Sequence, residues 1–170
     1  MTNRSNLRLY SFCNFYLNSI SQGIQTAHVI GRMSQKYRNI DSPQSELYWD
    51  WLKENQQNET IIVLNGGMGA DIYEAYKKFK GSLENFGIPT GIFFEEPRAL
   101  GIEGSSGSPT SWACVLPDYI YNTRLFPGGI ASMDAYGKEN EGEEGFELIA
   151  LAGTELFEFL QYKGRCPLAR

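Results

Sequence analysis

The chain has 170 residues, of which 42% are hydrophobic and 14% aromatic, so it is long enough to bury a core and too apolar for a disordered segment. Its formal net charge is -5, with acidic and basic residues mixed along the sequence. A protein that binds long nucleic acid usually carries a basic stripe, and a membrane span needs about 20 predominantly apolar residues in a row. The sequence has neither pattern, so we expect a cytoplasmic protein with no long nucleic acid and no membrane as partner.

Strand and helix patterns alternate along the first two thirds of the chain. The expected elements are a strand within 7–17 that ends near Asn14, a helix over 18–37, a helix that begins at Ser42 and Pro43, a strand over 60–64, a helix after a glycine turn, and strands over 90–96 and 110–116. The continuous apolar run at 60–64 is typical of a strand that is covered on both faces. We therefore expect an α/β fold, in which helices cover both faces of a small mixed four-stranded sheet.

The helix expected over 18–37 carries two stripes of different character. The apolar stripe predicts the face toward the core and consists of Ile20, Ile24, Ala27 and Gly31. The polar stripe has spacings of four, three and four residues and consists of Ser21, Gln25, His28 and Arg32. His28 is the only histidine of the chain. Two interpretations of the polar stripe stay open: a functional surface near the strand ends, or polar residues that are solvated or satisfied within the fold.

A glycine turn, NGGMGAD at 65–71, leads from the strand at 60–64 into the next helix. Backbone N–H groups at Gly66 and Gly67 would lie at a helix N-terminus, which favours a bound anion. The alternative is a tight turn in which Asp71 satisfies the start of the helix. The turn matches neither the P-loop nor the dinucleotide fingerprint. A second glycine- and serine-rich tract at 101–111 is expected to be a loop or a ligand lid.

The C-terminal third has a different composition, so we expect an α/β domain over 1–123 and a linker with an apolar C-terminal segment over 124–170. Residues 137–145 are polar and rich in glycine, which indicates a loop or linker. Residues 146–162 are strongly apolar. They either complete the core of the chain or bury themselves on another copy, which would make the protein a homo-oligomer, a dimer or a tetramer.

The cysteines, Cys13, Cys114 and Cys166, are scattered along the chain without a CxxC pair or a cluster with histidine. We therefore expect no metal site and no cofactor. Aromatic residues cluster over 10–16, and most of them are expected in the core. Those near Asn14 and Asn18 are candidates for stacking on a nucleobase.

A strand, a loop and then Q-x-x-H-[AV] on the first helix, here from Gln25 to Val29, resemble the archaeal and eukaryotic type of peptidyl-tRNA hydrolase. The resemblance spans roughly residues 7–122 and implies a small α/β domain with a four-stranded mixed sheet. It also implies that Glu96 lies where the family has a later acid. Thr110 would be the threonine that opens the last strand, and Ser111 would lie beside it near the site.

The same resemblance implies that charges of the family are missing here. The family has Gly-Lys before the glutamine, and this lysine is thought to act in catalysis, whereas this chain has Ile20 and Ser21. The Arg-x-Asp pattern of the first strand becomes residues 12–14, Phe-Cys-Asn. Ester hydrolysis needs a group that activates water and a cation or dipole that holds the oxyanion. Serine and asparagine do not replace the charge of a lysine, so we assign no catalytic residue.

Three functions follow as hypotheses. The favoured one is a non-catalytic binding protein that sequesters a small anionic nucleotide, as phage proteins sequester the cyclic oligonucleotide signals of bacterial defence. The alternatives are a peptidyl-tRNA hydrolase and an interaction or assembly protein without a small ligand. The candidate ligand-binding residues are Asn14, Asn18, Ser21, Gln25, His28, Arg32, Gly66, Gly67, Glu96, Thr110 and Ser111.

Overall fold

A computed structural model describes residues 6–53, 60–96, 107–125, 131–132 and 155–169. Its centre is a four-stranded sheet in the order β2-β1-β4-β3. The strands are β1 (Leu7–Cys13), β2 (Thr60–Asn65), β3 (Thr90–Glu95) and β4 (Ser108–Pro117). β1 is parallel to β2 and antiparallel to β4, and β3 is antiparallel to β4. The expected α/β fold with a mixed four-stranded sheet is confirmed.

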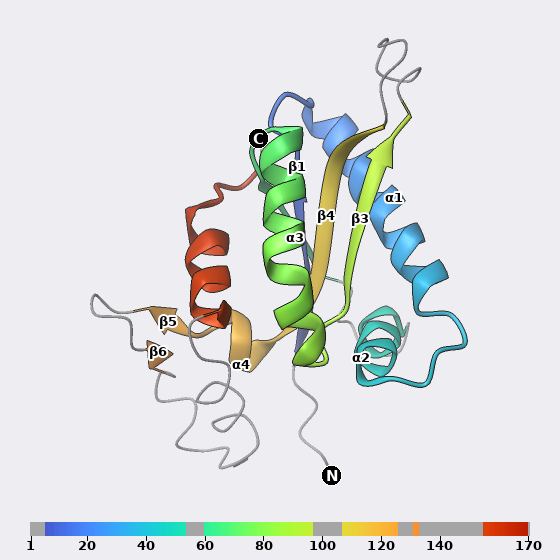
Figure 1. Ribbon diagram of the computed structural model, residues 1–170, viewed down its shortest axis with the longest axis vertical. Coiled ribbons are helices and arrows are strands. Elements are labelled where there is room, and N and C mark those ends of the chain that lie inside the picture. The colour runs from blue at the N-terminus through green and yellow to red at the C-terminus, as the bar shows by residue number, and fades with distance from the viewer. Residues whose placement is uncertain (1–5, 54–59, 97–106, 126–130, 133–154, 170) are drawn as a thin grey trace.

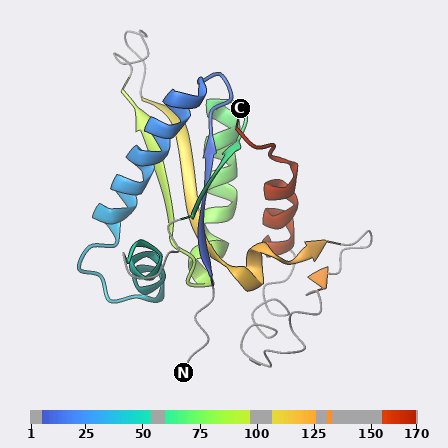
Figure 2. The same cartoon turned by 180° about the vertical axis from the view of Figure 1, so that it is seen from behind.

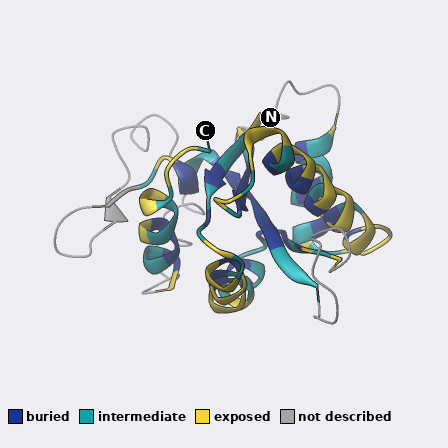
Figure 3. Cartoon of the chain, turned by 90° about the horizontal axis from the view of Figure 1, so that it is seen from above, coloured by how far each residue is buried: buried dark blue, intermediate teal, exposed yellow. Residues whose placement is uncertain are grey.

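Helices cover both faces of this sheet (Figures 1 and 2). The helices α1 (Ser19–Lys36) and α2 (Pro43–Leu52) lie on one face. The other face is covered by α3 (Gly69–Asn85) and by a C-terminal helix at 155–165. The short α4 (Asp118–Tyr121) follows β4, and β5 (Arg124–Leu125) pairs with β6 (Ala131–Ser132). Figure 3 shows the buried sheet between the two helix layers, whose outward sides are exposed.

Alternation along the strands divides the core into two clusters. Leu9 of β1 packs with residues of α1 and α2, whereas its neighbours Tyr10 and Phe12 pack with α3 and the C-terminal helix. Phe12 stacks on Trp112 of β4, with ring centroids 4.5 Å apart. Such burial of large rings on both faces is the main favourable term for a domain of this size.

The starts of α1 and α2 are capped by side chains. Asn18 caps α1, because its Oδ1 accepts a hydrogen bond from the backbone N–H of Ser21 at 2.8 Å. Ser42 caps α2 through the N–H of Ser45, and Pro43 occupies the first helical position. α1 packs tightly on the sheet at Gly91 of β3, where a Cβ would overlap the side chain of Met33.

Two expectations about buried faces are wrong. β2 is an edge strand, and in it only Leu64 is buried while Ile61 is exposed, so the apolar run at 60–64 is not covered on both faces. The apolar stripe of α1 faces solvent, with Ile20 76% and Ile24 50% exposed. The buried positions of this helix are Gln22, Gln25, Thr26, Val29 and Met33. Polar side chains face the sheet here because the sheet offers them hydrogen-bond partners.

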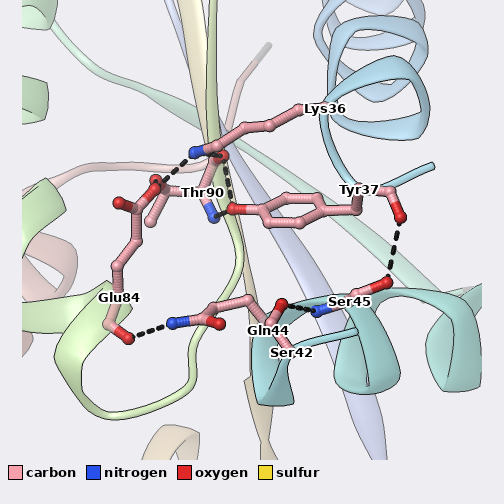
Figure 4. Close-up of polar contacts among 7 residues, drawn as sticks. All are labelled: Lys36, Tyr37, Ser42, Gln44, Ser45, Glu84 and Thr90. Atoms are coloured by element: carbon pink, nitrogen blue, oxygen red, sulfur yellow. Dashed lines mark hydrogen bonds and ion pairs between the residues drawn. The ribbon is translucent and has the colours of Figure 1, made fainter. Parts of the chain in front are cut away.

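At one end of the sheet, a polar network joins α1, α2, α3 and the start of β3 (Figure 4). The hydroxyl of Tyr37 accepts from the N–H of Thr90 at 2.9 Å and donates to its carbonyl at 3.0 Å. Lys36 pairs with Glu84, whose carboxylate also accepts from the hydroxyl of Thr90 at 2.7 Å. Gln44 donates to the carbonyl of Glu84. The network holds the entry of β3 against three helices.

Burial alone would disfavour both charges of the Lys36–Glu84 pair, but hydrogen bonds and charge–charge attraction together outweigh it. Burial raises the pKa of the Glu84 carboxyl, but the hydrogen bonds from Lys36 and Thr90 and the positive charges of Lys36 and Lys80 together lower it by more, so the net pKa is below its usual value. Burial lowers the pKa of the Lys36 ammonium, but its hydrogen bonds and charge interactions with Glu84 and Tyr37 leave the net pKa raised. Both groups are therefore charged at neutral pH.

The C-terminal residues return to the sheet. Leu156, Phe159 and Leu160 of the C-terminal helix are buried in the cluster beside α3. Lys78 of α3 pairs with Glu158 at 2.6 Å. The expected linker at 137–145 and the apolar residues 146–154 lie outside the described residues. Of the two roles considered for the tail, the contacts of 155–165 are those of packing on the chain's own core.

After this helix, residues 167–169 run along the outer edge of β2. The N–H of Asn65 donates to the carbonyl of Pro167 at 2.8 Å, and the N–H of Ala169 donates to the carbonyl of Val63 at 3.0 Å. Leu168 forms an antiparallel bridge with Leu64. The end of the chain thus acts as a short additional strand. Among the described residues, the structure contains no helix with the length and hydropathy of a membrane span.

Candidate ligand-binding site

Most of the candidate residues lie at one edge of the sheet, the edge formed by the carboxyl ends of β1 and β2. The parallel strands β1 and β2 end there, α1 and α3 begin there, and the end of β3 and the start of β4 lie alongside (Figure 1). In open α/β sheets, ligands bind in crevices outside the carboxyl ends of the strands. This edge is therefore where a ligand site is expected on general grounds.

Gln25 is the centre of a buried hydrogen-bond network at this edge. Its Oε1 accepts from the hydroxyl of Thr110 at 2.7 Å, and its Nε2 donates to a carboxylate oxygen of Glu95 at 2.7 Å. The hydroxyl of Ser111 donates to the carbonyl of Gln25 at 3.0 Å. Gln25 is only 7% exposed. Both ends of its amide are hydrogen-bonded within the chain. At this position, the polar stripe of α1 is therefore a hydrogen-bonded contact between the helix and the sheet.

The acid of this network is Glu95, whereas the sequence assigned that role to Glu96. Strand alternation explains the difference, because Phe93 and Glu95 face α1. Phe94 faces α3 instead, where its ring contacts Tyr73. Glu96 follows the strand and is exposed.

His28 and Arg32 lie on the same helix as Gln25 but outside this network. His28 is exposed and stacks on Phe93, with ring centroids 4.6 Å apart and planes 14° from parallel. The Arg32 guanidinium carbon lies 5.9 Å from the same ring centroid. The polar stripe of α1 is thus divided between a buried glutamine and two side chains that lie on Phe93.

Asn14, Asn18 and Ser21 form the connection between β1 and α1. The Oδ1 of Asn14 accepts from the N–H of Tyr16 at 3.1 Å, and its own N–H donates to the carbonyl of Thr110 at 2.9 Å. The side chain of Asn18 is occupied with the N–H of Ser21, as described for the helix cap. These polar groups hold the shape of the loop.

The glycine turn is held in the same way. The N–H of Gly66 donates to the carbonyl of Cys13 at 2.8 Å, and the N–H of Gly67 donates to Oδ1 of Asn65 at 3.1 Å. The N–H of Met68 donates to the Asp71 carboxylate at 2.8 Å. Gly67 has a φ of +93°, which favours glycine. The contacts are those of the tight turn with Asp71 at the helix start, and they occupy the N–H groups considered for an anion.

A cavity of about 350 Å³ opens between the β1–α1 loop and the end of the chain. Phe15, Leu17, Gln22 and Asn65 line one side, and residues 167–169 line the other. Sequence reasoning missed Gln22, because it lies in neither stripe that was recognised on α1. The signal that could have found it is the spacing of Gln22, Gln25, Thr26 and Val29, which places them on one helix face.

Gln22 is only 4% exposed. Its Nε2 donates to the carbonyl of Asn14 at 3.3 Å. Its Oε1 is buried and has no hydrogen-bond partner among the described residues. Phe15, in contrast, is 42% exposed, and its ring lies 4.0 Å from that of Tyr16. The residues that line the cavity therefore include an accessible aromatic ring and a glutamine whose amide oxygen is buried.

Beneath Gln22, a small polar cluster connects α1 to β1. The hydroxyls of Ser11 and Thr26 are 2.9 Å apart, and the Thr26 hydroxyl donates to the carbonyl of Gln22 at 2.9 Å. The thiol of Cys13 lies 3.5 Å from the same carbonyl. Burial raises the pKa of the Cys13 thiol, so it is protonated and is a poor nucleophile at neutral pH.

Within the ranges that the structure describes, His, Cys, Asp and Glu side chains form no group of three that could hold a metal ion. A comparison with known protein families and with curated proteins finds no match to this chain. The resemblance to peptidyl-tRNA hydrolases continues to rest on the sequence motif alone.

Proposed function

We propose that the chain is a non-catalytic binding protein that sequesters a small anionic nucleotide in the cavity between the β1–α1 loop and residues 167–169. The observation that carries this proposal is the combination of an accessible ring, Phe15, with the amides of Gln22 and Asn65 in one cavity. Ligand sites of about 300–1,000 Å³ typically combine apolar walls with a few polar groups. Aromatic rings also give sequence-tolerant stacking on bases.

The helix α1 begins at the rim of this cavity, since Leu17 and Gln22 line it on either side of the helix start. Its first turn contains no acidic residue. The positive end of the helix dipole therefore favours an anionic group at the rim. A nucleotide whose base enters the cavity would place its phosphate toward this helix start.

Binding is preferred to turnover because neutral residues hold the positions that carry charge in the resembled family. Ser21 stands at the position of the lysine, and its N–H serves the helix cap. Gln25 is engaged at both ends of its amide by Glu95 and Thr110. The finer identity, a cyclic oligonucleotide signal bound by a phage protein in the host cytoplasm, is supported by the resemblance stated for the sequence.

The test is a thermal-shift and native mass spectrometry screen with cyclic di- and trinucleotides, beside an assay of peptidyl-tRNA hydrolysis. We expect a cyclic nucleotide to raise the melting temperature and to be recovered unchanged. Turnover of peptidyl-tRNA that is lost in His28→Ala would favour the hydrolase instead. No stabilisation by any nucleotide would overturn the proposal.

The second candidate function, an assembly protein, is favoured by the exposed apolar side chains at the start of α1. Ile20 and Ile24 lie one turn apart on the outward face of the helix. Whether the protein binds a nucleotide or acts in assembly, we propose that it is a homo-oligomer, a dimer or a tetramer. Light scattering of the natural chain and of Ile20→Ser/Ile24→Ser tests this, and a monomer in both samples would refute it.

A further inference from the structure

Two basic side chains lie on a pair of tyrosine rings where β1 begins and β4 ends. Arg8 of β1 places its guanidinium carbon 4.4 Å from the ring centroid of Tyr121 in α4. Lys163 of the C-terminal helix places its Nζ 4.7 Å from the ring centroid of Tyr10, two residues further along β1. The two rings are neighbours, with centroids 6.2 Å apart. Three separate parts of the chain thus bring two cations to one aromatic surface.

Neither cation has an acidic partner among the described residues. Asp118, which lies near Tyr121, accepts from the N–H of Tyr119 at 2.9 Å and forms no ion pair with either cation. The Nζ of Lys163 has three N–H donors, and its contact within the described ranges is a long one, 3.5 Å to the carbonyl of Tyr121. The ion pairs of the described residues belong instead to Lys36, Lys53, Lys77 and Lys78.

The groups near these cations that could become negative are kept neutral. Burial raises the pKa of the Tyr10 and Tyr121 hydroxyls by more than the neighbouring Arg8 lowers it. Burial also raises the pKa of the Cys114 thiol, which is the ionisable cysteine near Lys163. At neutral pH the phenols and the thiol therefore carry no charge, and the two positive charges are not balanced within this part of the chain.

The Lys163 ammonium is in an unfavourable position without a counter-charge. Burial lowers its pKa, and the positive charge of Arg8 lowers it as well. Lys36, which pairs with Glu84, has a raised pKa instead. Arg8 and Lys163 are both half-buried, so each keeps part of its surface in solvent. An anion from solvent would supply the charge that the chain does not.

The chemistry of the two side chains restricts the kind of anion. Arginine offers a planar fork of N–H donors that matches phosphate and carboxylate, and lysine adds a point charge. A phosphate monoester carries a charge of about −1.5 to −2 at about pH 7, which matches two cations better than the single charge of a carboxylate.

We propose that Arg8 and Lys163 form a binding site for the phosphate group of a small molecule, with the rings of Tyr10 and Tyr121 beside it. The site is separate from the cavity at the β1–α1 loop, because Arg8 lies near the start of β1 and the loop follows its end. This inference does not rest on the proposed function, since it needs neither that cavity nor the start of α1.

The test is an NMR titration of the ¹⁵N-labelled chain with sodium phosphate at neutral pH and constant ionic strength. We expect the amide signals of Tyr121 and Lys163 to move saturably with phosphate and not with chloride. Arg8→Met and Lys163→Met should each bind phosphate at least about tenfold more weakly, because each removes a charge-assisted hydrogen bond. Acetate should bind the natural chain more weakly than phosphate, and equal binding would overturn the assignment to a phosphate group.

The matched controls are Lys80→Met and Arg38→Met, which remove the same charges elsewhere. Lys80 of α3 is half-buried like Lys163, and its Nζ lies 5.9 Å from the ring centroid of Tyr76. Arg38 is exposed after the end of α1. Both controls should bind phosphate as the natural chain does, and urea unfolding shows that each variant is folded. If all four variants bind alike, phosphate responds only to net charge and the site is refuted.

A measurement on the natural chain needs no variant. The ¹³Cε signals of the lysines are followed through a pH titration with phosphate and with chloride. A bound phosphate stabilises the charged amine, so the titration midpoint of Lys163 should move to higher pH, whereas that of Lys80 should stay. An unchanged Lys163 midpoint would refute the site. The nucleotide screen described for the proposed function is read independently, because neither result depends on the other.

Discussion

Replacing Gln25 with glutamate tests the buried network at the start of α1, because it changes one atom type and leaves the shape of the side chain. In the natural chain the Gln25 Nε2 lies 2.7 Å from a carboxylate oxygen of Glu95. In Gln25→Glu, two carboxylates would meet at this distance. Like charges in one site raise the pKa of the pair, so one of the two glutamates takes up a proton.

The size of the effect has a ceiling. Once protonated, the introduced glutamate donates to Glu95 and accepts from Thr110, as Gln25 does in the natural chain. The destabilisation therefore cannot exceed the free energy of protonating a glutamate, which is about 1.36 kcal/mol for each pH unit above an unfolded-state pKa of about 4.3. The ceiling is about 4 kcal/mol at about pH 7.5 and about 1 kcal/mol at about pH 5. The substitution raises the folded-state pKa, so the lost stability returns as the pH falls.

The assay is urea unfolding of the natural chain and of Gln25→Glu at both pH values. We expect a loss of about 2–4 kcal/mol near neutral pH that shrinks to about 1 kcal/mol or less in acid. Gln25→Met is the matched control, because it removes both hydrogen bonds and titrates at neither pH. Its loss should be similar in both buffers. If Gln25→Glu loses the same free energy of unfolding at both pH values, the contact between Gln25 and Glu95 is refuted.

Further predictions concern the core and the polar network around Lys36 and Glu84. The lowered pKa of Glu84 contributes stability that is present above its unfolded-state pKa and is lost as the pH falls through the folded-state pKa. Glu84→Gln should therefore flatten the acid limb of the stability curve and reduce stability by about 1 kcal/mol at neutral pH. In urea unfolding, Gly91→Ala should destabilise the protein by about 1–3 kcal/mol, because the new Cβ would overlap Met33. Gly31→Ala should instead stabilise it by about 0.5–1 kcal/mol, because a Cβ at this helical position meets open space. Phe159→Ala should destabilise by about 3–5 kcal/mol, and a loss below about 1 kcal/mol would mean that the C-terminal helix is not docked in solution.

The sequence was sufficient for the four strands of the sheet, for α1, α2 and α3 and for their order, because local signals specify them, whereas the short α4, β5 and β6 were not expected. Capping by Asn18 and Ser42, proline at the start of α2 and the apolar runs of the strands each act within a few residues. The boundaries of α1 and β3 accordingly differ from the expected ranges by no more than one residue at either end. These signals do not depend on what lies across the sheet.

The orientation of the elements depends on long-range partners, and there the sequence misled. Hydrophobic periodicity placed Ile20 and Ile24 in the core, but α1 turns Gln25 and Thr26 inward because β1, β3 and β4 supply hydroxyl and carboxylate partners. A pattern of hydrophobicity cannot distinguish a polar residue that faces water from one that is paired inside. The cavity was missed for a related reason, since one of its walls, residues 167–169, comes from the far end of the chain.

The pairing of residues 167–169 with β2 also determines how the protein can be handled. The short strand covers the outer edge of β2 at Val63 and Asn65, so it shields backbone groups that could otherwise pair with another molecule and promote aggregation. The first strand, β1, begins at the end of the sheet opposite to this short strand (Figure 1). An affinity tag or a fluorophore attached before β1 should leave the cavity intact. One attached after residue 169 should disturb residues 167–169, which line the cavity.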